Sequence, residues 1–333
     1  MTPSVRWGIL GAAGIAVRQV IPAMQASKHC VVTALASRDP ARARTVAAQF
    51  GIGASCGSYE ELLARPDVDA VYIPLPNHLH VQWSIRALEA GKHVLCEKPI
   101  GMNVAEAEIL LAAASAHPRL KVMEAFMYRF HPQWIRTREL VRDGAIGAIQ
   151  SVQSFFSYFN VDPKNVRNIA NIGGGALLDI GCYGISLARF LFESEPLGVQ
   201  ARMEYDPTFA TDRLTSAILD FGGRVATFTV GTQMARHQRV NIVGAEGRIE
   251  IEIPFNAPSD RPCRVQLQRG AESEEIMFET CNQYGLMADA FAEAILRDTP
   301  VPTPLEDAAA NMRVIDAVLQ AASQPRTHLS PDR

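Results

Sequence analysis

Lysine is scarce in this sequence: the chain of 333 residues contains five lysines and 27 arginines. The formal net charge is −3, so the chain lacks the basic excess that is typical of nucleic-acid-binding proteins and of polybasic membrane patches. No apolar run reaches the roughly 18 residues of a membrane span. The first residues, MTPSVRWGILGAAG, enter a strand pattern without the charged segment of a secretion signal. We therefore expect a cytoplasmic protein without nucleic-acid or membrane partners.

The chain also lacks any C-x-x-C spacing, which zinc and redox sites commonly use. We expect its scattered cysteines to be reduced, small apolar residues of the core. We therefore predict neither a disulfide framework nor a metal site. The six cysteines are Cys30, Cys56, Cys96, Cys182, Cys263 and Cys281.

The order of strand-like and helical patterns predicts two domains, since 333 residues exceed the roughly 250–300 at which one core stops growing. Over residues 1–125, β-rich runs such as VRWGILG, VVTALAS and HVLCEKP alternate with helical patterns. This alternation predicts a parallel sheet and a Rossmann dinucleotide-binding domain. Over residues 126–333, period-two strands and glycine-containing hairpin turns predict an α+β domain with a large, open, predominantly antiparallel sheet. A last helix, at about 305–322, is expected to pack back on the first domain. The fold class is therefore α/β.

The first expected strand ends in GAAGIA, where a dinucleotide-binding turn usually has Gly-x-Gly-x-x-Gly. Gly11 keeps the first glycine, whereas Ala13 and Ala16 occupy the second and third positions. Together with Gly14 and Ile15, this turn opens a helix whose backbone amides suit a pyrophosphate. The alternative is a strand–helix turn that binds no ligand.

The second expected strand ends at Ser37 and Arg38, where an acidic residue would bind the ribose diol of NAD. Asp39 does not fill this role because Pro40 follows it, and Asp-Pro is typical of a helix N-cap with proline at the first helical position. Serine and arginine suit the 2′-phosphate of NADP, with Arg42 assisting. We predict NADP in preference to NAD. The alternative is an arginine that is only solvated.

Two further elements contain candidate catalytic residues. Lys98 follows the apolar strand of HVLCEKP, at the end where ligands bind in open α/β sheets, and Pro99 favours an extended backbone before it. Further along, GGGALLDIGCYGI has Asp179 and Tyr183 four residues apart, on one face of a helix. The three glycines before that helix are expected to form a mobile entry. The alternatives are a surface lysine and a buried Tyr–Asp hydrogen bond in a core helix.

Five segments, in this order and at these distances, resemble the glucose–fructose oxidoreductase/inositol dehydrogenase/MocA (Gfo/Idh/MocA) family: WGILGAAGIA, VYIPLPNHLH, GKHVLCEKPIGMNVAEAE, EAFMYRFHPQ and GGGALLDIGCYGI. The resemblance extends from Arg6 to about Gln320. Many members have histidine where this chain has Tyr183. In having tyrosine at this position, the chain resembles the subgroup of glucose–fructose oxidoreductase, NADP-dependent D-xylose dehydrogenase and dimeric dihydrodiol dehydrogenase. The resemblance implies that Lys98 lies beside the nicotinamide. It also implies that the second domain binds the substrate and forms a homodimer or homotetramer through its sheet.

These residues lead to a mechanistic hypothesis for an NADP-dependent oxidoreductase that acts on a sugar or polyol hydroxyl. Tyr183 removes the proton from that hydroxyl, the anomeric one of an aldose, and Lys98 lowers the pKa of the phenol and polarises the same oxygen. Asp179 binds a second hydroxyl, and the product is a lactone. The alternatives are a trans-dihydrodiol dehydrogenase, a sugar reductase, an enzyme of the glucose–fructose type that does not release NADP, and a non-catalytic NADP-binding sensor.

Further positions extend the candidate site. The resemblance assigns Arg167 to the cofactor, although Val166 replaces the tryptophan that precedes this arginine in many relatives. Arg129 and Tyr284 are candidate substrate-binding residues; an ion pair and core packing are the respective alternatives. Together with the two turns, the expected cofactor contacts are Pro76, Asn77, His80, Glu97, Lys98 and Arg167.

Overall fold

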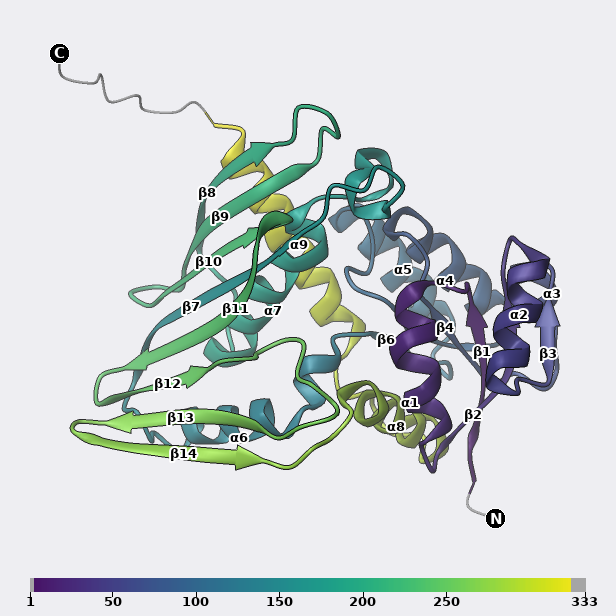
Figure 1. Ribbon diagram of the computed structural model, residues 1–333, viewed down its shortest axis with the longest axis horizontal. Coiled ribbons are helices and arrows are strands. Elements are labelled where there is room, and N and C mark those ends of the chain that lie inside the picture. Colours follow the sequence, from purple (N-terminus) through teal and green to yellow (C-terminus); the bar gives the residue numbers. More distant parts are fainter. Residues whose placement is uncertain (1–2, 325–333) are drawn as a thin grey trace.

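A computed structural model describes residues 3–324, which form two sheets connected by helices (Figure 1). The first sheet has six strands in the order β3-β2-β1-β4-β5-β6, and every pair is parallel. The predicted Rossmann sheet is therefore confirmed. Its strands are almost wholly buried because helices cover both faces, which explains their continuous apolar sequences. The bounds are β1 Val5–Leu10, β2 Cys30–Ala36, β3 Ala54–Cys56, β4 Ala70–Ile73, β5 His93–Cys96 and β6 Val122–Glu124.

The helices of this domain begin where the sequence predicts caps. Asp39 is the N-cap of α2, since its carboxylate accepts hydrogen bonds from the amides of Ala41 and Arg42, and Pro40 occupies the first helical position. The predicted cap is confirmed. Asp39 is thus engaged by its own helix. The helices are α1 Ile21–Gln25, preceded by a π-helical turn Ala16–Val20, α2 Pro40–Phe50, α3 Tyr59–Leu63, α4 His80–Glu89 and α5 Val104–Ala116.

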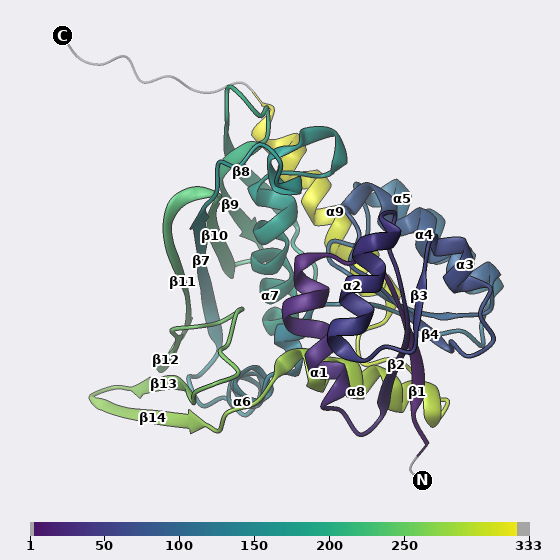
Figure 2. The same cartoon turned by 45° about the vertical axis from the view of Figure 1, so that its right-hand side comes forward.

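The second sheet has eight strands in the order β14-β13-β12-β11-β7-β10-β9-β8. Only β7 and β10 pair in parallel, so the prediction of a predominantly antiparallel sheet is confirmed. Helix α7 packs on the face toward the first domain, and no helix among residues 3–324 covers the opposite face (Figures 1 and 2). The bounds are β7 Ile149–Phe159, β8 Gly198–Tyr205, β9 Asp212–Asp220, β10 Val225–Gly231, β11 Gln233–Gly244, β12 Gly247–Ile251, β13 Cys263–Arg269 and β14 Glu272–Phe278.

The last two helices connect the two sheets. Helix α8 packs on the first sheet although it follows the second sheet in the chain, and Phe291 contacts Trp7 with ring centroids 5.7 Å apart. Helix α9 contacts α5 and β6 on one side and α7 and β8 on the other (Figure 2). The division at residues 125 and 126 therefore remains a prediction. The helices of this half are α6 Pro132–Arg142, α7 Cys182–Phe192, α8 Gln283–Leu296 and α9 Leu305–Ala322.

The helical segment Ala170–Phe192 is long and apolar enough to cross a membrane by composition alone. In the fold, however, 83% of the apolar 18-residue window within this segment is buried, as expected for a core helix. It packs against β7 and β10 of the second sheet. Its hydrophobicity is therefore explained by its position between the two sheets.

The three glycines before this helix are closely packed, so the predicted mobile entry is wrong. The amides of Gly174 and Gly175 donate to the carbonyls of Ile169 and Arg167 over 3.0 and 2.9 Å. Gly175 has a φ of 119°, and a Cβ at this position would collide with the carboxylate of Asp212. That carboxylate accepts a 2.7 Å hydrogen bond from the Leu177 amide at the start of the helix. The glycines thus permit a close approach that fixes the helix start.

We expect Gly175→Ala to destabilise the protein, because the added methyl group meets Asp212 and the residue must keep a positive φ. Gly223→Ala is the matched control, since Gly223 has a φ of 87° but no neighbour within 4 Å. The loss of unfolding free energy in urea should be larger for Gly175→Ala by about 1 kcal/mol or more. Equal losses in the two variants would contradict the packing role of Gly175.

Candidate active site

The candidate residues lie at the carboxyl-terminal edge of the first sheet. The turn at Gly11 follows β1, Asn77 follows β4 and Lys98 follows β5. This edge faces the segment at the start of α7. The side-chain amide of Asn77 donates to the Gly173 carbonyl over 3.0 Å, and Lys98 Nζ donates to the Asp179 backbone carbonyl over 2.5 Å. The site therefore lies between the two sheets, where open α/β folds bind their ligands.

Lys98 and Asp179 form a buried ion pair. Lys98 Nζ is 3.3 Å from Asp179 Oδ1, and the two side chains are only 11% and 12% exposed. Burial lowers the pKa of Lys98, but the charges of Asp179, Cys182 and Glu97 together outweigh burial, and the pKa is raised. The peptide bond between Lys98 and Pro99 is cis. Lys98 is therefore a buried ammonium group rather than a surface lysine.

Asp179 accepts hydrogen bonds from three side chains. Its Oδ2 accepts from Tyr158 Oη at 2.6 Å and from Arg167 Nε at 2.7 Å, while Oδ1 faces Lys98. Burial alone would raise the pKa of this carboxyl, but the charges of Arg167 and Lys98 outweigh burial and hold the pKa well below its usual range. Asp179 is therefore a carboxylate at neutral pH.

Two of these donors have roles that sequence reasoning missed. Arg167 is expected at the cofactor, but its Nε is bound to Asp179, so only the other nitrogens of this 42% exposed side chain are available to a cofactor. Tyr158 was assigned to no site. Side chains alternate between the two faces of β7, which puts Tyr158 on the same inward face as Val152 and Phe156. This alternation is the feature of the sequence from which the position of Tyr158 could be predicted.

The ring of Tyr183 lies against Lys98, with Nζ 5.0 Å from the ring centroid. Its phenol donates to Met127 Sδ over 3.4 Å, and burial raises its pKa well above the usual value. The pKa of Tyr183 is thus raised rather than lowered as expected, because burial and, after it, the charges of Tyr284 and Glu97 disfavour the phenolate. Lys98 does lie next to both Asp179 and the ring of Tyr183, and the turn Leu177–Gly181 that contains Asp179 is π-helical. The convergence of the ammonium group and the phenol oxygen on one substrate atom remains a prediction.

Four aromatic side chains hold the ring of Tyr183. The centroid distances are 5.3 Å to Phe126, 5.8 Å to Tyr128, 5.9 Å to Phe156 and 5.1 Å to Phe255. These residues come from the end of the first sheet, from β7 and from the loop after β12. The orientation of the phenol is therefore determined by packing.

Two predicted ligand contacts are wrong. His80 is fully buried, and its two ring nitrogens lie 2.8 and 2.7 Å from the carbonyl oxygens of Pro99 and Leu75, so its side chain cannot line the cofactor. Arg129 donates to Asp307 over 2.7 Å and is only 10% exposed. Both residues of that pair line a different pocket, of about 770 Å³, between α6, α7 and the segment before α9. Arg129 therefore forms the ion pair that was the alternative to substrate binding.

Glu97 and Tyr284 lie near the same strand end. Glu97 accepts from Tyr72 Oη at 2.6 Å and from the Lys98 amide at 3.3 Å, so it braces the backbone before the lysine. Burial raises the pKa of Glu97. The pKa of Tyr284 is raised by burial and then by the charge of Glu97. The half-buried Pro76 begins the turn that contains Asn77. The ligand roles of Pro76, Glu97 and Tyr284 remain predictions.

The turn after β1 fits a pyrophosphate. Gly11 has a φ of 122°, and a Cβ there would lie 2.9 Å from Leu75 Cδ2, so glycine is required. Arg42 Nε and Nη2 donate to the Ala12 carbonyl over 3.1 and 2.7 Å and brace the turn. The amides of the following helix start, at residues 13–15, have no helical partner and suit phosphate oxygens.

At the neighbouring strand end, Ser37 is buried and its Oγ accepts from the Asp39 amide over 3.2 Å, whereas Arg38 is exposed. Ser37 thus shapes the turn, and the exposed Arg38, which interacts with the phenol of Tyr59, presents a cationic group beside the position of a ribose. The residues present fit a nucleotide with an additional phosphate on that ribose.

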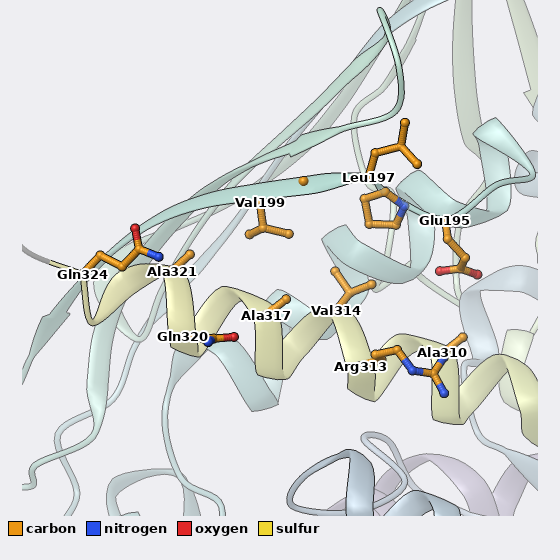
Figure 3. A pocket seen from close by; sticks show the side chains of 12 residues that line it. Glu195, Leu197, Val199, Ala310, Arg313, Val314, Ala317, Gln320, Ala321 and Gln324 are labelled. Carbon is orange, nitrogen blue, oxygen red and sulfur yellow. The ribbon is translucent and has the colours of Figure 1, made fainter.

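A pocket of about 370 Å³ between α9 and β8 lies away from this site (Figure 3). Leu197, Val199, Val314 and Ala317 line it, and Figure 3 shows the side chains of Val199, Val314 and Ala317 between the strand and the helix. None of the candidate catalytic residues contributes to it. Within residues 3–324, no three His, Cys, Asp or Glu side chains are grouped to bind a metal ion.

Comparisons with known proteins agree with this architecture. A relative from Rhizobium meliloti, named as an uncharacterized oxidoreductase, is 47% identical over 326 residues, which are 96% of this chain and 97% of the relative. A D-xylose 1-dehydrogenase (NADP(+)) from Haloferax volcanii is 37% identical over 317 residues, 95% of this chain and 97% of that protein. The crystal structure of a 3-ketoreductase from Actinomadura kijaniata, with NADP and TDP-benzene, matches with a TM-score of 0.90 and 34% identity over 96% of this chain and 98% of that one.

Family models match both parts of the chain. The model described as an oxidoreductase family with an NAD-binding Rossmann fold matches residues 5–126. The model of the GFO/IDH/MocA C-terminal domain matches residues 134–250. Since these matches together span more than half of the chain, and the relatives cover nearly all of it, the protein is an oxidoreductase of the Gfo/Idh/MocA family.

Proposed function

We propose that the protein is an NADP-dependent dehydrogenase that oxidises a hydroxyl carbon of a sugar or polyol, such as the anomeric carbon of a cyclic aldose. One observation is central: Lys98 Nζ contacts the Asp179 carboxylate and lies 5.0 Å from the Tyr183 ring centroid, at the strand end near the phosphate-binding turn. An ammonium, a carboxylate and a phenol around one position suit proton transfer at a hydroxyl group. The similarity to a D-xylose 1-dehydrogenase supports a sugar substrate.

NADP, when bound, supplies the hydride acceptor for such an oxidation. The side chains of this protein handle the proton and the orientation. In its deprotonated form, Tyr183 Oη takes the proton of the substrate hydroxyl, and Lys98 Nζ donates a hydrogen bond to the same oxygen. Asp179 accepts a hydrogen bond from a second hydroxyl. Because burial raises the pKa of Tyr183, the phenol has to release its own proton to solvent before it can act as a base, and the nearby charge of Lys98 stabilises the resulting phenolate.

Reduction of a keto sugar is the second candidate, and the environment of Tyr183 favours it. A phenol whose pKa is raised by burial keeps its proton at neutral pH. It can donate this proton to the oxygen of a carbonyl that is being reduced. The similarity to a 3-ketoreductase over 96% of the chain supports this direction. Rates with NADP⁺ and aldoses, compared with rates with NADPH and keto sugars, separate the two candidates.

We also propose NADP rather than NAD as the cofactor. Arg38 is exposed at the end of β2, next to Ser37, and can pair with a 2′-phosphate. Asp39 is the acidic alternative for binding a ribose diol, but its carboxylate is engaged by two amides of α2. The relative from Haloferax volcanii is named as an NADP(+) enzyme, which supports the same assignment.

A homodimer or homotetramer through the second sheet remains a proposal. It is supported by the sheet face that no helix among residues 3–324 covers. Exposed apolar side chains on this sheet include Ile218 and Val243. Burial of such a face against a second copy would remove apolar surface from water.

We expect Arg38→Ala to weaken the use of NADP while leaving the use of NAD nearly unchanged. Loss of a charge-assisted contact with the 2′-phosphate should lower kcat/KM for NADP by about tenfold or more. Steady-state kinetics with both cofactors measure this change. Arg44→Ala, which alters an exposed arginine of the following helix α2, is the control. An equal loss with NAD, or a wild-type preference for NAD, would refute the assignment.

We expect Tyr183→Phe and Lys98→Ala each to lower kcat by about 100-fold or more, because each removes a group that handles the substrate proton. NADP binding, followed by fluorescence titration, should stay within a few-fold of wild type. Lys164→Ala, at an exposed lysine outside the site, should keep full activity. If either active-site variant retains kcat within a few-fold of wild type, its proposed role is wrong.

A further inference from the structure

Tyr158 is the donor to Asp179 that neither the sequence nor the mechanism above uses. Its phenol donates to Asp179 Oδ2 over 2.6 Å from the far end of β7. Opposite this residue, the pairing of β7 with β11 is irregular, with a register shift between Gln233 and His237. Such bulges commonly redirect a side chain near a functional site. The sheet is thus distorted at the residue that contacts the site.

The two carboxylate oxygens of Asp179 are used unequally. Oδ2 already accepts two short bonds, from Tyr158 at 2.6 Å and from Arg167 at 2.7 Å. Oδ1 has one long contact, with Lys98 Nζ at 3.3 Å. A carboxylate has about four acceptor positions in all. The remaining acceptor capacity therefore belongs mainly to Oδ1, on the side of the lysine.

Tyr158 is suited to act only as a donor. It is half-buried, and burial together with the charge of Asp179 raises the pKa of its phenol far above the usual value. The phenol thus keeps its proton at any physiological pH. A phenylalanine would fill the same space on β7 but would leave Oδ2 with Arg167 as the remaining donor, and the side chain of Arg167 is 42% exposed.

We propose that Tyr158 is a positioning residue that fixes the rotation of the Asp179 carboxylate, so that Oδ1 and Lys98 Nζ together bind a substrate with hydroxyl groups on adjacent carbons. The reacting oxygen lies at Lys98, and the neighbouring hydroxyl donates to Oδ1. The 3.3 Å between Nζ and Oδ1 is a separation that two oxygens on adjacent ring carbons can span. This inference rests on the proposed function, which supplies a sugar or polyol substrate.

The kinetic test compares Tyr158→Phe with wild type on an aldose and on its 2-deoxy analogue. For the aldose we expect kcat/KM to fall by about tenfold, mainly through KM, because one hydrogen bond that orients the binding carboxylate is lost. KM for NADP should not change. For the deoxy analogue, which has no neighbouring hydroxyl, the variant and wild type should differ by less than about twofold. Tyr205→Phe, at an exposed tyrosine of the same sheet, is the control.

An equal loss with both sugars would mean that Tyr158 has only a structural role, and an unchanged KM for the aldose would also overturn the proposal. A crystal structure of Tyr158→Phe with NADP provides a second readout that needs no turnover. We expect the Asp179 carboxylate to rotate and its contact with Lys98 to be lost. An unrotated carboxylate would overturn the positioning role. If wild type turns over no sugar, the proposed function fails, and this structure still decides the role of Tyr158.

Discussion

The buried contact between Lys98 and Asp179 is the interaction on which the rest of the site depends. Removing two charges from water is costly, and their attraction offsets this cost only when their other polar atoms are hydrogen-bonded. Here Tyr158 and Arg167 donate to the carboxylate, and the ammonium group also donates to the Asp179 carbonyl. A single lysine therefore connects the end of β5 to the start of α7, and through them the two sheets.

The surroundings of this contact hold its geometry before any ligand binds. Gly175 allows the backbone before α7 to approach Asp212, whose carboxylate caps the helix start. Four aromatic rings fix Tyr183, and His80 bonds the carbonyl of Pro99, directly after the lysine. A site whose donors and acceptors are already oriented spends less free energy on rearrangement when charge develops on a substrate oxygen. Its protonation state, with a charged lysine, a charged aspartate and a neutral phenol, follows from burial and proximity.

Features that depend on local patterns could be predicted from the sequence. Apolar runs between helical patterns indicate the parallel sheet, Asp-Pro indicates the cap at Asp39, and a lysine at a strand end indicates the site. Contacts between distant residues could not be predicted. The alternation of β7 is the same whether Tyr158 packs in a core or binds Asp179. Arg129 pairs with a residue 178 positions away. Three successive glycines are compatible with mobility and with close packing, and only the position of Asp212 distinguishes the two.

The most direct measurement is a crystal structure of the protein with NADP and a bound aldose or keto sugar. The account predicts that one substrate oxygen lies within about 3.2 Å of both Tyr183 Oη and Lys98 Nζ, and that the neighbouring hydroxyl donates to Asp179 Oδ1. A sugar held beside the nicotinamide with neither the phenol nor the ammonium group in hydrogen-bond reach of its reacting oxygen would contradict the account.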